Sequence, residues 1–199
     1  MRNVALAFAV GLIAGCAVST QRYYLPSDPQ YAQTGTVCGF VPWGQAQVAL
    51  ADGLTTAIQL QPLEGRVALS MQIALPQGAS VRLMEPKFRL QVPSTGAEYS
   101  ARLDRFQVAV FGRDGRPGYY EYVSATDVLV GKGRNADLAG LDTQYAKKDL
   151  FISSAVFTTV PAPSYMLKLP PIEVNGFLRE AQSVPVALVE KMGVAVCVQ

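Results

Sequence analysis

Hydrophobic residues occupy every second position of the segment 67–75: Val67, Leu69, Met71, Ile73 and Leu75. The residues between them are small or polar. Successive side chains of an extended chain point to opposite faces, so this spacing predicts a β-strand with one buried face. The same pattern returns at 87–92, where Phe88, Leu90 and Val92 face inward.

Turn residues follow these segments at regular intervals. Pro76-Gln77-Gly78 and Pro93-Ser94-Thr95-Gly96 each predict a turn, and Asn175-Gly176 is the strongest short hairpin signal in the chain. Segment 150–160 is apolar on both faces, as is typical of a central strand. We expect further strands at 37–44, 80–83, 105–111, 119–123, 125–130, 165–169, 172–178, 184–189 and 192–198.

Many short strands with at most one helix predict an all-β fold. The helix is expected to begin at Asn135 and run through Lys148, although Gly140 weakens it. We predict an antiparallel β-sandwich, with an immunoglobulin-like arrangement carrying additions as one form of it. A closed barrel is the alternative.

Composition narrows the class of protein. Half of the 199 residues are hydrophobic and 16% are charged, which is not the composition of a disordered chain. The formal net charge is only +2, so nothing in the charge balance points to a nucleic-acid partner.

The chain contains no histidine. Neither a Ser-His-Asp nor a Cys-His nucleophile can therefore be built, nor can a histidine zinc site. Carboxylate chemistry is left, and two acidic residues facing each other in a cleft would suit a hydrolase. The candidates are Asp104, Asp114, Glu121, Asp127, Asp137, Asp142 and Asp149. We expect no catalysis, no cofactor and no metal.

The segment Gly131-Lys132-Gly133-Arg134 is glycine-rich and basic but lacks the spacing of a phosphate-binding loop. We expect it to be a solvated connection between strands.

The first sixteen residues carry a different pattern. Arg2 precedes an apolar run over 4–14, and the small residues Ala14-Gly15 precede Cys16. The run is shorter than the roughly 20 residues that span a bilayer, which favours a cleaved signal. Residues 1–16 resemble a bacterial lipoprotein signal peptide ending in the lipobox Ile13-Ala14-Gly15-Cys16.

This resemblance implies cleavage before Cys16, a diacylglycerol thioether on its sulfur, and acylation of the new N-terminus. Such a protein is anchored to the membrane through Cys16. In a Gram-negative host the absence of Asp after the cysteine, where Ala17 stands, implies the outer membrane, with the domain facing the periplasm.

Lipidation leaves two of the three cysteines, Cys38 and Cys197. An even pair in an oxidising compartment predicts a disulfide, with two buried thiols as the alternative.

The domain boundaries follow from composition. Residues 1–15 are the expected signal peptide and 37–199 the single β domain. Residues 16–36 are rich in Ser, Thr, Gln and Pro and show no periodic apolar face. We expect them to form a lipidated, flexible tether that spans about 25 Å.

One loop and its following strand combine the residues that dominate interaction hot spots. They are Arg113, Arg116, Tyr119, Tyr120 and Tyr122. Alternate residues of a strand share one face. The alternative is therefore that these tyrosines line the core or lie on an exposed strand face without binding anything. We expect a binding or assembly protein of the cell envelope whose partner is another envelope protein or a cell-wall component. A carbohydrate- or peptidoglycan-binding module is the alternative.

Overall fold

The computed structural model describes residues 17–37, 41–51, 53–111, 117–135 and 148–195. Most of these residues lie in antiparallel strands, so the all-β prediction is confirmed. The strands are β1 (Ala17–Pro26), β2 (Ala32–Val37), β3 (Val41–Ala51), β4 (Leu54–Leu63), β5 (Arg66–Pro76), β6 (Ser80–Leu83), β7 (Lys87–Gln91), β8 (Glu98–Arg102), β9 (Arg105–Phe111), β10 (Pro117–Ser124), β11 (Leu129–Val130), β12 (Lys148–Phe157), β13 (Ser164–Lys168), β14 (Ile172–Val174), β15 (Phe177–Arg179) and β16 (Ser183–Ala195).

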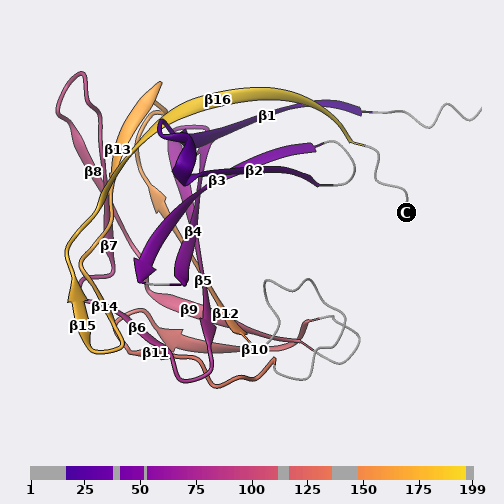
Figure 1. Ribbon diagram of the computed structural model, residues 1–199. Coiled ribbons are helices and arrows are strands. Elements are labelled where there is room, and N and C mark those ends of the chain that lie inside the picture. Colours follow the sequence, from indigo (N-terminus) through magenta and orange to yellow (C-terminus); the bar gives the residue numbers. More distant parts are fainter. Residues whose placement is uncertain (1–16, 38–40, 52, 112–116, 136–147, 196–199) are drawn as a thin grey trace, which may run out of the picture.

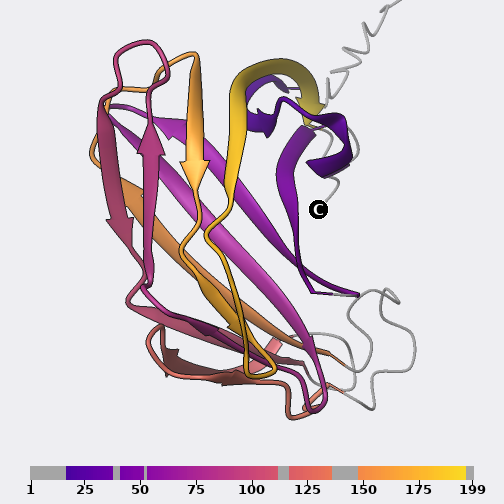
Figure 2. The same ribbon diagram turned by 60° about the vertical axis from the view of Figure 1, so that its left-hand side comes forward.

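Twelve strands form one sheet in the order β10-β9-β12-β5-β4-β1-β16-β13-β7-β8, and β2 and β3 join it beside β4. The sheet curls, so that β8 from one end contacts β12 near the other (Figures 1 and 2). A small second sheet, β11-β6-β14-β15, lies at the lower end of the view in Figure 1. The fold is therefore sandwich-like, as predicted.

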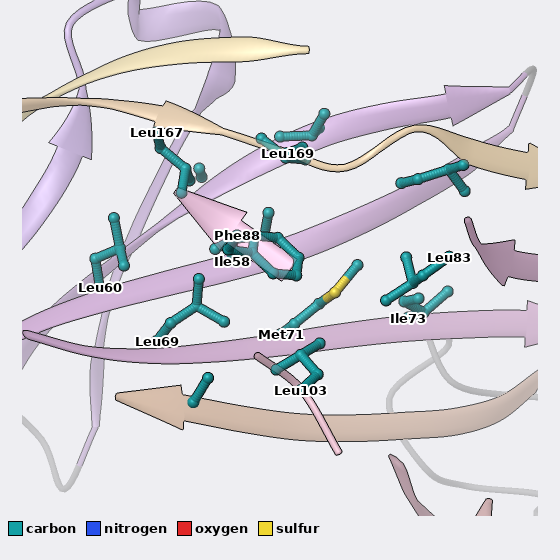
Figure 3. Close-up of a cluster of buried hydrophobic side chains, with 14 of the residues drawn as sticks. Ile58, Leu60, Leu69, Met71, Ile73, Leu83, Phe88, Leu103, Leu167 and Leu169 are labelled. Carbon is teal, nitrogen blue, oxygen red and sulfur yellow. The ribbon is translucent and has the colours of Figure 1, made fainter. Parts of the chain in front are cut away.

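The core fills the space enclosed by the curled sheet. Figure 3 shows Met71 and Ile73 of β5, Ile58 of β4 and Phe88 of β7 converging there, all buried. In β5 the hydrophobic residues that predicted the strand are buried, and the small or polar residues between them are partly exposed. β12 pairs with β5 on one side and β9 on the other, which confirms its predicted central place.

The expectation of a flexible tether over 16–36 is wrong for the described residues. β1 begins at Ala17 and pairs with β16 from Ala17↔Ala195 to Pro26↔Val186. A short 3-10 helix, η1 (Pro29–Tyr31), then leads into β2, which pairs with β3. The described strands therefore begin at Ala17 rather than at Val37.

Two tyrosines explain why this polar segment folds. Tyr23 and Tyr24 are both buried, on opposite faces of β1. The Tyr24 hydroxyl donates a hydrogen bond to the carbonyl oxygen of Ala162 at 2.8 Å. Gly44 of β3 lies so close to Tyr23 that a Cβ there would stand 2.6 Å from the ring. Composition hid the strand because its large buried side chains are tyrosines rather than aliphatic residues.

Other boundaries shift more modestly. The predicted strand at 125–130 is reduced to Leu129–Val130, and the segments 184–189 and 192–198 belong to one strand, β16. The Asn175-Gly176 hairpin is confirmed, since both residues have positive φ between β14 and β15. The expected helix after Asn135 lies outside the described residues. Within the described ranges, no helix is long and apolar enough to cross a membrane.

Candidate functional site

The predicted binding surface is present in part. Tyr120 and Tyr122 lie on β10 with 44% and 59% of their surface exposed, so neither ring belongs to the core. Tyr119 pairs with Val110 in the same strand. Its side chain lies outside the described part of the structure, as do Arg113 and Arg116.

Arg105, which the sequence did not single out, completes this surface. Its guanidinium carbon lies 4.6 Å from the centre of the Tyr122 ring, a cation–π contact. Arg105 pairs with Ser124 across β9 and β10, so it shares the face of Tyr122 and reaches it diagonally. The contact holds the Tyr122 ring in place while leaving it more than half exposed.

The register extends this face across the sheet. Tyr122 is opposite Gln107, which is opposite Ile152 on β12. Ile152 is opposite Gln72 on β5, Gln72 is opposite Ala57 on β4, and Ala57 is opposite Gln47 on β3. Residues directly opposite each other share a face, so these six side chains form one line perpendicular to six strands. We call Tyr122, Gln107, Ile152, Gln72, Ala57 and Gln47 the transverse row.

The surface around the transverse row is uncharged over three strands. Between Arg66 and Lys148 at its two ends, the outward positions of β4, β5 and β12 hold no charged side chain. They are Thr55, Ala57, Gln59, Gln61, Leu63, Ala68, Ser70, Gln72, Ala74, Leu150, Ile152, Ser154 and Val156, and all of them except the buried Leu150 are at least partly exposed.

The opposite layer, formed by β7, β8 and β13, carries paired charges on its surface. Glu98 Oε2 lies 2.9 Å from Lys168 Nζ, and Glu98 Oε1 lies 3.6 Å from Arg89 Nε. The absence of charge along the transverse row is therefore a property of one face of this molecule rather than of its whole surface.

Two of the row's amides are available to a ligand. The side chains of Gln72 and Gln107 are partly exposed, and neither forms a hydrogen bond with the described part of the chain. Gln47 differs, since its amide nitrogen donates to Gln33 Oε1. An amide offers two donors and an acceptor, which suits neutral polar groups such as hydroxyls.

A second cluster lies inside the same end of the sheet. Asp149 of β12 has no exposed surface, and its carboxylate accepts hydrogen bonds from the backbone N–H groups of Lys132 and Arg134. Arg134 Nη1 donates to Asp149 Oδ2 at 2.6 Å, while Nη2 donates to Glu121 Oε2 at 2.8 Å. Asn135 donates to the carbonyl oxygens of Ala109 and Lys148.

This cluster corrects the interpretation of 131–134 as a solvated connection. Gly131 is buried, and a Cβ there would lie 2.0 Å from the carbonyl oxygen of Pro76. The loop is thus held against β5 and β12 by a buried carboxylate. Of the candidate carboxylates, Glu121 and Asp149 are brought together, and the guanidinium of Arg134 lies between them. This arrangement holds the loop in place, and the two carboxylates do not face each other across a cleft as a general acid and a general base would.

Metal ligation finds no support among the described residues, where no three His, Cys, Asp or Glu side chains gather. The three cysteines, Cys16, Cys38 and Cys197, lie outside the part of the chain that the structure describes, as do Asp114, Asp137 and Asp142.

Sequence reasoning missed the transverse row because its six members come from six different strands. A signal was present in β3, β4 and β5, where mainly Gln, Ser and Ala rather than Lys or Glu alternate with the buried residues. Only the register shows that these positions form a line.

Comparison of this chain with protein-family models, curated proteins and solved structures finds no match.

Proposed function

We propose that this protein is a non-catalytic lipoprotein of the bacterial cell envelope that binds another envelope component through the outer face of β9 and β10. The observation that carries the proposal is the exposure of Tyr120 and Tyr122 beside Arg105. Tyrosine and arginine contribute strongly to binding because they offer large contact areas and directed hydrogen bonds.

The second part of the proposal is the anchor. The lipobox resemblance supports lipidation of Cys16, and in a Gram-negative host it supports the outer membrane with the domain in the periplasm. Because β1 begins at Ala17, the domain would sit directly at the lipid surface rather than at the end of a tether. Replacement Cys16→Ser should release the protein into the soluble periplasmic fraction, and continued membrane association would refute the anchor.

A photocrosslinking experiment tests the binding surface in intact cells. The full chain carries p-benzoylphenylalanine at Tyr120, and a matched version carries it at Ser100, which is exposed on β8 of the charged layer. We expect a reproducible crosslink to one envelope component from position 120 and none from position 100. Equal products from both positions, or none from position 120, would contradict the proposal.

We also propose the disulfide Cys38–Cys197. Two features support it: an even pair remains after lipidation, and the strands next to the two cysteines end on the same side of the molecule. The β2–β3 hairpin ends at Val37 and Val41, and β16 ends at Ala195 (Figures 1 and 2). Intact-mass analysis after alkylation under denaturing conditions should find no free thiol on either residue, and two alkylated cysteines would exclude the bond.

A further inference from the structure

We infer that the transverse row binds an uncharged β-1,4-linked glycan chain that lies across the strands. This inference rests on the proposed function and names the ligand class for the same face. It is drawn from the register, the exposure and the charge of the row.

The spacing of the row fits such a chain. Neighbouring strands lie about 4.8 Å apart, so the six strands of the row extend over about 24 Å from Tyr122 to Gln47. A pyranose ring of an extended β-1,4-linked glycan advances by nearly one strand spacing. One ring can therefore lie over each strand.

The alternation of amide and aliphatic side chains along the row matches the alternation of sugar rings along the glycan. Glutamines stand on every second strand, at Gln107, Gln72 and Gln47, and the aliphatic side chains of Ile152 and Ala57 stand between them. Each ring of a β-1,4-linked glycan is flipped relative to its neighbours, so every second ring presents the same polar groups. The amides thus meet equivalent hydroxyl or acetamido groups, and the aliphatic side chains meet ring carbons.

Tyr122 provides the end of the site. Its ring is 59% exposed and held by Arg105, so it offers an ordered apolar surface for stacking on a sugar ring. The guanidinium of Arg105 supplies further donors beside that ring. The uncharged surface of β4, β5 and β12 would meet a neutral glycan without desolvating any charged group. On the six strands of the row, the described outward positions offer an anionic ligand Arg105 beside Tyr122 and otherwise only Arg66 and Lys148 at the ends of the face. No cation lies along the middle of the row, which makes an anionic ligand a poorer fit.

The test is calorimetric titration of the mature lipidated protein, in detergent, with chitohexaose, cellohexaose and chitotriose. We expect a hexasaccharide to bind, and the trisaccharide to bind more weakly because it covers half of the row. Binding of cellohexaose would mean that hydroxyl groups are sufficient, whereas binding of chitohexaose alone would mean that acetamido groups are needed. Either result supports the inference.

Variants place the ligand on the row. We expect Tyr122→Ala to weaken binding about tenfold and Tyr122→Phe to retain most of it, because the phenyl ring still stacks. Gln72→Ala and Gln107→Ala should each weaken binding about threefold to tenfold. Gln91→Ala is the matched control, since Gln91 is a partly exposed glutamine on β7 of the charged layer. Circular dichroism melting curves check that each variant is folded.

Two outcomes would overturn the inference. In one, neither hexasaccharide binds at millimolar concentration. In the other, the row variants bind as tightly as the Gln91→Ala control. A specific crosslink from position 120 combined with either outcome would leave the proposed function standing and exclude the glycan as its ligand.

Discussion

Arg134 and Asp149 meet through two hydrogen bonds at once, from the backbone N–H at 2.7 Å and from Nη1 at 2.6 Å. The Asp149 carboxylate has no exposed surface, and the Arg134 side chain is only 12% exposed. A buried charge needs such partners, because its desolvation costs more than a single contact returns. Together they fix the loop after β11 to the central strand β12.

We predict that Asp149→Asn lowers the free energy of unfolding at pH 7 by about 3–5 kcal/mol, because it leaves Arg134 without its buried counter-charge. Glu121→Gln is the matched control. Glu121 is 41% exposed, so its loss should cost less than about 1 kcal/mol. Urea denaturation measures both values, and equal costs for the two variants would contradict the structural role of Asp149.

Gly131→Ala should destabilise the protein by about 3 kcal/mol or more, because its new Cβ would lie 2.0 Å from the carbonyl oxygen of Pro76, which the sheet holds in place. Gly65→Ala is the comparison, since open space surrounds that Cβ and only its φ of +66° opposes the change. We expect it to cost about 1–2 kcal/mol in the same denaturation experiment. A larger loss from Gly65→Ala would contradict the close approach at Gly131.

Tyr24 should make stability fall in alkaline solution. Burial, followed by the neighbouring Tyr165, raises the pKa of Tyr24 well above its ordinary value. The unfolded chain loses this proton near pH 10 while the folded chain keeps it, so the contribution is complete below pH 10 and is lost as pH rises further. Tyr24→Phe should flatten this alkaline decline, measured as the melting temperature between pH 9 and 11. An unchanged decline would mean that other groups cause it.

The charged layer should show the opposite dependence. A hydrogen bond from Lys168 lowers the pKa of Glu98, with smaller contributions from Lys168 and Arg89 as charges. The stability that Glu98 provides is therefore present above its unfolded pKa and is lost as pH falls through the lowered folded value. We expect nuclear magnetic resonance titration to show a pKa for Glu98 that rises in Lys168→Met. No rise would exclude this contact in solution.

Hydrogen exchange tests whether residues 17–26 form the strand β1 or the flexible tether that the sequence suggested. Amides of β1 that pair with β16 should be protected to nearly the same degree as those of β5, since Tyr24 packs in the core and Tyr23 is buried on the other face of the strand. Amides in the exposed turn 93–96 serve as the rapidly exchanging reference. If the β1 amides exchanged as fast as those of this turn, the segment would be a flexible tether in solution, as the sequence suggested.

The sequence by itself determined the class of fold and many of its strands. Alternation in segments such as 67–75 and 87–92 depends only on the two-residue period of an extended chain, which local sequence records directly. The Asn175-Gly176 turn was predictable for the same reason, because the positive φ values that it needs are a local property.

Tertiary structure decided what local sequence could not record. β1 folds because β16, whose paired residues lie 160 or more positions later in the chain, pairs with it and because both of its tyrosines are buried. Asp149 and Arg134 looked like ordinary surface charges until the loop was seen to lie over β12. The transverse row exists only through the register of six strands, since hydrogen bonding between strands, rather than proximity along the chain, places Tyr122 in line with Gln107 and Gln72.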